Sequence, residues 1–209
     1  MSKKILLGAG LGLILSAAAA QAAPITVQPQ DLSAIGNVTA VYVFADAGDT
    51  SILNELLPSA IPQIFCNHST GGCTGANAGD TMNLFFQNGV MRFSLHNVDT
   101  GSTFFNDTAD GDGNYHVKIS TDYTDFGQGA LPGAADTVIT TLINGGMSVT
   151  YVGWEDLTAG QGSDFDYNDL IFAFANTTTK RQVPEPFTLS LMGAGLAGAA
   201  WARRRKNKA

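Results

Sequence analysis

Short runs of alternating or β-branched residues, each ending at a turn signal, constrain the fold of this chain most. In residues 90–97, VMRFSLHN, the apolar Met91, Phe93 and Leu95 alternate with polar residues, the pattern of a half-buried antiparallel strand. The sequence NGG at 144–146 is typical of a hairpin turn, because these residues accept positive φ. Further strands are predicted at 37–44, 115–120, 137–143, 146–154 and 169–174.

These runs predict a single all-β domain, an antiparallel β-sandwich or jelly roll, over residues 23–175. No long segment has a 3.6-residue period, which excludes a helical bundle. Residues 51–65, SILNELLPSAIPQIF, are the one helix candidate, cut short by Pro58 and Pro62. A polar linker, NTTTKRQ, is expected at 176–182.

Residues 1–22 have the three parts of a secretory signal peptide. Lys3 and Lys4 precede an apolar run, and the small residues of Ala20-Gln21-Ala22 fit cleavage by signal peptidase after Ala22. The run has no polar face, which argues against a buried first helix. The remaining chain is therefore expected outside the cytoplasm.

The other end carries an apolar run at 187–202 without a charged residue. As a helix its 16 residues would span about 24 Å at about 1.5 Å per residue, less than the roughly 30 Å of a bilayer core. The arginines that follow can snorkel to cover the deficit. Positive charge at both ends is placed as expected for segments that stay in the cytoplasm.

Val183, Pro184, Glu185 and Pro186 precede the apolar run, and Arg203, Arg204 and Arg205 follow it. With this order of motif, apolar run and basic cluster, residues 183–209 resemble the PEP-CTERM sorting signal of Gram-negative bacteria. The resemblance implies processing by an exosortase, after membrane anchoring through the 187–202 helix, in bacteria that make exopolysaccharide. The mature protein would then lie at the cell surface or in an extracellular, biofilm-type matrix.

The chain between the two ends is strongly acidic. Residues 23–182 contain four basic and seventeen acidic side chains, a formal net charge of −13. Such a field repels nucleic acid and anionic lipid and favours cations. A need for solubility would explain part of the excess of acidic residues, but it would not explain why these residues cluster in the sequence.

Cys66 and Cys73 are the only cysteines, and they bracket the short loop NHSTGG. After export they would form a disulfide in an oxidising compartment. A metal site formed by His68 and the two sulfurs is the alternative, with only three ligands.

The segment 153–174, GWEDLTAGQGSDFDYNDLIFAF, predicts a calcium site. A flat strand would put Asp169 on the aromatic side, so DFDYND is expected to curve as a loop, with the strand beginning near Leu170. A curved Asp-x-Asp-x-Asn run supplies the oxygen ligands that Ca²⁺ prefers, and acids ending the preceding strand could complete them. A solvated acidic turn is the alternative. The candidate ligands are Glu155, Asp156, Asp164, Asp166, Asn168 and Asp169.

A second acidic run, DTADGDGNYH at 107–116, repeats the alternate spacing in Asp110, Asp112 and Asn114. It is not an EF-hand, because Tyr115 replaces the required glycine and Thr121 the closing glutamate. A turn between strands is the preferred interpretation, with a weak cation site as the alternative.

Residues 80–175 resemble an uncharacterised family of extracellular β-rich domains. The similarity rests on HV at 116–117, GWEDL at 153–157 and DFDYNDLIF at 164–172, where a Glu-Asp-Leu strand end precedes a glycine-bearing loop and Asp-x-Asp-x-Asn-Asp. Calcium binding is suspected in this family, whose molecular role is not established.

We expect a non-enzymatic, calcium-binding protein with an adhesion or structural role. A secreted glycan hydrolase using Glu155 with Asp164 or Asp166 is one alternative. No nucleophile motif surrounds His68, His96 or His116, which are expected at the surface or in turns. An ice-binding protein is the other alternative, although only one short Thr-rich patch occurs.

Overall fold

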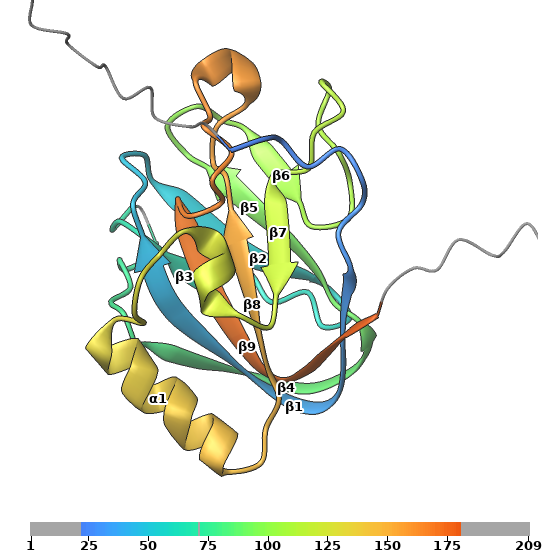
Figure 1. The fold of residues 1–209 in the computed structure, drawn as a ribbon, viewed down its shortest axis with the longest axis vertical. Helices are drawn as coiled ribbons and strands as arrows, with labels where there is room; N and C mark the ends of the chain where they lie inside the picture. The colour runs from blue at the N-terminus through green and yellow to red at the C-terminus, as the bar shows by residue number, and fades with distance from the viewer. Residues whose placement is uncertain (1–21, 71, 181–209) are drawn as a thin grey trace, which may run out of the picture.

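Antiparallel strands form two sheets in the computed structural model, which describes residues 22–70 and 72–180 (Figure 1). One sheet has the order β4-β1-β9-β8-β7, and the other has the order β3-β2-β5-β6. The strands are β1 Asp31–Ala45, β2 Ser51–Leu57, β3 Phe65–Cys66, β4 Thr81–Val90, β5 Arg92–Asn97, β6 Thr103–Phe105, β7 Val117–Ser120, β8 Val149–Trp154 and β9 Leu170–Lys180.

The two sheets share one apolar core. The Phe93 and Phe174 rings meet between the sheets with their centroids 4.7 Å apart, and Phe65 stacks on Phe172 at 5.9 Å. Met91, Phe93 and Leu95 are fully buried, as their alternation predicted. The two antiparallel sheets and the small helical content confirm an all-β domain.

A second apolar cluster lies on the outer face of the five-stranded sheet. There α1 (Gly133–Asn144) and the 3₁₀-helix η1 (Tyr123–Phe126) pack on β1, β8 and β9. Ala135 and Ile139, four residues apart on α1, are buried in this cluster. The other short helix, η2, covers Ala159–Gln161.

The predicted strand at 137–143 is wrong, because these residues belong to α1. Their β-branched side chains cost a helix only about 0.7 kcal/mol each at most, which tertiary packing easily outweighs. The hydroxyls of Thr137 and Thr141 also donate hydrogen bonds to backbone carbonyls one helical turn earlier, each with an O–O distance of 2.8 Å. The NGG sequence at 144–146 consequently ends a helix and does not form a hairpin turn.

The predicted helix at 51–65 is also wrong, because its first part is β2. Ser51, Leu53 and Glu55 are buried while their neighbours are partly exposed, so the segment has the period of a strand. It pairs with β3 on one side and β5 on the other. The two prolines lie after β2 and therefore interrupt no strand.

β9 continues to Lys180, which corrects the expected linker at 176–182 over residues 176–180. These residues pair with the first part of β1, where Thr178 faces Ser33. Both strands bend midway, at Gly36 and Asn176, which have positive φ. Asn176 secures the bend by donating a hydrogen bond from Nδ2 to the Asn37 carbonyl at 2.9 Å.

Among residues 22–70 and 72–180, no helix is both long and apolar enough to cross a membrane. The expected signal peptide up to residue 21 and the expected sorting segment at 183–209, with its helix at 187–202, lie outside the described residues.

Candidate metal centre

The loop between β8 and β9, residues 155–169, carries the predicted calcium ligands. Phe165 and Tyr167 both have positive φ, at 57° and 62°, so the chain curves sharply here. Their rings are buried, whereas Asp164 is exposed and Asp166 partly exposed. The loop is therefore curved and β9 begins at Leu170, in agreement with the sequence prediction.

Tyr167 attaches this loop to the domain. Its hydroxyl accepts a hydrogen bond from the Ile25 N–H at 2.7 Å and lies 3.2 Å from the Tyr115 carbonyl. Its backbone also crosses closely over Gly153 in β8, where a Cβ atom would collide with the Tyr167 carbonyl and the Phe126 ring. Glycine is thus required at position 153 so that the loop can lie against β8.

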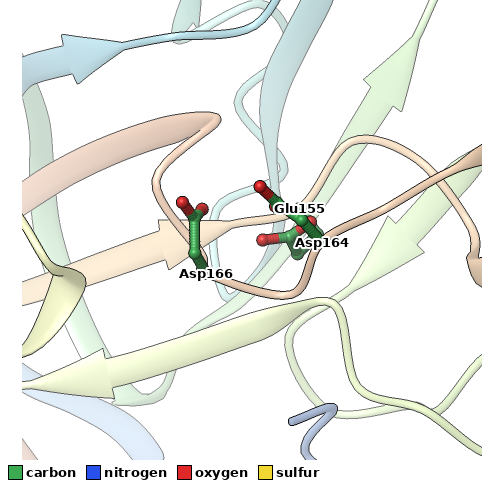
Figure 2. A group of neighbouring side chains, drawn as sticks. All are labelled: Glu155, Asp164 and Asp166. Atoms are coloured by element: carbon green, nitrogen blue, oxygen red, sulfur yellow. The ribbon is translucent and has the colours of Figure 1, made fainter. Parts of the chain in front are cut away.

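Glu155, Asp164 and Asp166 form one group, which we call the loop cluster. Each contributes a carboxylate oxygen, and these oxygens all lie within 4.8 Å of one another. Figure 2 shows Glu155 directly after β8, with Asp164 and Asp166 on the returning part of the loop. Three of the six predicted ligands are therefore brought together.

Contacts within the protein itself hold the Glu155 side chain in place. This side chain is fully buried, the Tyr167 N–H donates to Oε1, and the Ser163 hydroxyl donates to Oε2. Burial raises the pKa of Glu155, and the charges of Asp164 and Asp166 raise it further against those hydrogen bonds. Burial likewise raises the pKa of Asp166. The cluster therefore resists carrying three negative charges by itself.

The other three predicted ligands make different contacts. Asn168 donates from Nδ2 to Asp166 Oδ2 at 2.6 Å, so it orients that carboxylate. Asp169 accepts a hydrogen bond from the Asp156 N–H at 3.0 Å. Burial, followed by the charges of Glu155, Asp156 and Asp164, raises the pKa of Asp169 to about 8.

Asp156 faces the second sheet, where it joins contacts that the sequence did not predict. The Ser51 hydroxyl donates to Asp156 Oδ2 at 3.0 Å. Asn97 donates from Nδ2 to the Asp156 carbonyl at 2.9 Å and to Asp49 Oδ2 at 3.0 Å. No spacing in the sequence could reveal these partners, because Ser51 and Asn97 come from distant strands.

The second acidic run forms a turn organised by Asp110. Asp110 Oδ1 accepts hydrogen bonds from the backbone N–H groups of Asp112 and Asn114, each at 2.9 Å. Partial burial raises the pKa of Asp110, but these bonds and His116 outweigh it and the net pKa is lowered. This geometry agrees with the preferred interpretation as a turn.

His116 is buried, which corrects its expected place at the surface or in a turn. Its Nε2 lies 2.7 Å from Asp110 Oδ2, and its ring stacks on Phe104 with centroids 4.0 Å apart. His68 is exposed and His96 is partly exposed.

Cys66 and Cys73 are joined as a disulfide in the structure, with their Cα atoms 6.3 Å apart. The short loop they close includes the exposed His68. The pairing leaves no free thiolate for the alternative metal site, because both sulfurs are bonded to each other.

Beyond the described domain, residues 182–206 match the PEP-CTERM protein-sorting motif. The chain carries a PEP-CTERM sorting motif. This motif indicates an exported protein that is anchored in the membrane through the C-terminal segment, processed by an exosortase and sorted to the surface. A comparison with curated proteins gave no match.

Proposed function

We propose that the described domain is a calcium-stabilised β-sandwich with an adhesion or structural role. It would act at the surface or in the exopolysaccharide matrix of a Gram-negative bacterium, after removal of a signal peptide. The observation that carries this proposal is the loop cluster, in which a buried carboxylate and two more accessible ones bring oxygens within 4.8 Å of one another.

A cation at the loop cluster would relieve a repulsion that the hydrogen bonds to Glu155 and Asp166 offset only in part. Two unit charges about 5 Å apart repel by roughly 3 kcal/mol at an effective dielectric constant of about 20, and by less where water reaches Asp164. The basic side chains described by the structure are engaged elsewhere. Arg92 pairs with Asp107 at 2.8 Å, and Lys118 lies over the Phe126 ring.

The chemistry of the donors favours calcium. The cluster offers carboxylate oxygens without an imidazole or thiolate, which suits a hard cation and disfavours zinc. Calcium tolerates irregular coordination by a curved loop, whereas Mg²⁺ requires a nearly ideal octahedron. A bound ion would connect the end of β8 to the segment that leads into β9, and would thereby stabilise the folded domain.

The burial of Glu155 favours a non-enzymatic role. A glycan hydrolase needs both carboxyl groups in contact with substrate or water, and Glu155 exposes none of its surface. Its two oxygens are moreover engaged by Ser163 and Tyr167. These contacts suit a structural ligand better than an acid or base catalyst.

Calorimetric titration with CaCl₂ tests the site directly. The wild-type chain should bind one Ca²⁺ at the loop cluster, and Asp164→Asn should weaken binding at least about tenfold, equal to about 1.4 kcal/mol. Asp112→Asn is the matched control, because it removes the same charge from an exposed position in the other acidic turn. Equal affinity in all three proteins would refute the assignment of the loop cluster.

A further inference from the structure

A group of exposed apolar side chains lies on the five-stranded sheet, away from the loop cluster. We call it the outer patch and define it as Ile35 on β1 with Phe85, Phe86 and Val90 on β4, which are 77%, 71%, 64% and 50% exposed. A contiguous patch of large, solvent-exposed apolar side chains marks a site of interaction with another protein or with a membrane.

Ile35, Phe86 and Val90 of the outer patch face away from the core between the sheets, and Phe85, at the register shift of β4, is exposed beside Phe86. Leu32 and Ala34 point into that core, so Ile35 on the same strand points outward. On β4, Gln87 is buried while its neighbours Phe86 and Asn88 are exposed, which sets the same orientation. Since β4 is an edge strand, its outer side is open as well.

The outer patch lies beside the place where the chain leaves the domain. Ser33 pairs with Val90 on one side and with Thr178 on the other, so Val90 is two strand spacings, about 10 Å, from Thr178. Thr178 is four residues before the first residue of the sorting motif, at most about 14 Å of extended chain. In Figure 1, β4 and the bent parts of β1 and β9 lie together at the lower end of the molecule, and β9 ends at the lower right.

Charge is distributed unequally between the two ends of these strands. The Ala45–Leu170 end carries Asp46, Asp169 and the loop cluster. In contrast, the segments 32–45, 81–98 and 170–180 contain no aspartate or glutamate. At the exit end the sequence has one acidic residue, Asp31, and two basic residues, Lys180 and Arg181. The apolar side is thus less repelled by an anionic lipid surface than the Ala45–Leu170 end is.

We propose that the outer patch rests in the headgroup region of the membrane while the sorting segment holds the chain there. The proposal rests on the membrane anchoring assigned to the PEP-CTERM motif. Transfer of phenylalanine and isoleucine side chains from water to the headgroup region of a bilayer lowers their free energy. The contact orients the acidic end and its loop cluster away from the bilayer and keeps the segment to be processed close to the lipid.

The test uses the full chain in nanodiscs of phosphatidylethanolamine and phosphatidylglycerol, with the fluorophore NBD on a single added cysteine. Asn88→Cys places the probe on the outer patch and leaves all four apolar residues intact. Asp112→Cys places it on an exposed turn at the opposite, acidic end, where the His116 carbonyl that follows this turn accepts a hydrogen bond from the Glu155 N–H. The probe at position 88 should be quenched by doxyl-labelled lipid and should lose several-fold in quenching by aqueous iodide, whereas the probe at 112 should keep its access to iodide.

Substitutions in the Asn88→Cys background separate membrane contact from self-association and from loss of anchoring. Phe85→Ser with Phe86→Ser should restore iodide quenching, and Val98→Ser, a control on an exposed apolar residue near the acidic end, should not. Iodide access at position 88 in a chain that stays with the discs would overturn the proposal and leave the anchoring intact. Protection only in discs holding two copies would overturn it in favour of self-association. Loss of the chain from the discs would overturn both the contact and the anchoring.

Discussion

Glu155 and Asp169 are carboxyl groups that the fold places where ionisation is unfavourable. Both have a raised pKa, chiefly because they are buried, and the pKa of Asp169 reaches about 8. Burial also raises the pKa of Glu55, which accepts a hydrogen bond from Gln87, to about 7. A domain that keeps such groups has a stability that depends on protons or on a cation.

The stability of the metal-free protein should fall as pH rises from 5 to 8. Folding takes up protons where the folded-state pKa exceeds the usual carboxyl value near 4, so the free energy of unfolding is largest below that value and is lost as pH passes the raised pKa values. Asp110, with its lowered pKa, loses its contribution only under more acidic conditions. Melting temperatures in EDTA across this range provide the measurement.

Asp169→Asn supplies the control for this pH dependence, because an amide oxygen can still accept the hydrogen bond from the Asp156 N–H. The variant should show a shallower decline between pH 5 and 8. A wild-type melting temperature that stays constant or rises over this range would contradict the assigned pKa shifts.

Gly153→Ala should destabilise the domain by about 2 kcal/mol or more, because the new methyl group collides with the Tyr167 carbonyl and the Phe126 ring. Gly129→Ala is the matched control, since nothing lies within 4 Å of its Cβ position. It should change stability by no more than about 0.5 kcal/mol. Urea unfolding of both variants checks this, and equal stability would show that the loop does not need its close approach to β8.

At the scale of elements, Asn97 links the two sheets near the loop cluster. Its Nδ2 donates to Asp49 and to the Asp156 carbonyl, and its Oδ1 accepts from the Asp99 and Thr100 N–H groups. Asn97→Ala leaves buried polar groups without partners and should cost about 2–3 kcal/mol. Exposed Asn88→Ala should cost almost nothing, and a similar loss in both variants would argue against the link.

The sequence predicted elements well where side-chain periodicity alone decides them. In β5 the apolar Phe93 and Leu95 are fully buried, as their spacing predicted. DFDYND curves, as predicted from the position of Asp169, which a flat strand would place on the aromatic side. Residues 137–143 have high β propensity but form α1, because the outer face of the sheet needs a covering layer. Residues 51–57 form β2 because β3 and β5 offer hydrogen-bond partners on both sides, which a local pattern cannot show.

At the scale of the whole molecule, acidic and apolar surface groups lie at different ends of the domain. Acidic loops gather at the Ala45–Leu170 end, and the outer patch lies towards the end from which the sorting motif follows. The clustering of Glu155, Asp164 and Asp166 was predictable because these residues lie within one loop of the chain. Its support from the second sheet, and the outer patch on β1 and β4, depend on strand pairing between distant segments and could not be predicted from spacing.

Calorimetry of the exported chain, first in EDTA and then in excess CaCl₂, tests whether a calcium ion joins β8 to the β9 loop. At a free Ca²⁺ concentration 100 times Kd, binding contributes about 2.7 kcal/mol, which for a domain of this size raises the melting temperature by about 5–10 °C. Asp164→Asn should lose most of this increase. An unchanged melting temperature of the wild-type chain in calcium would contradict the proposed stabilisation of the domain by calcium.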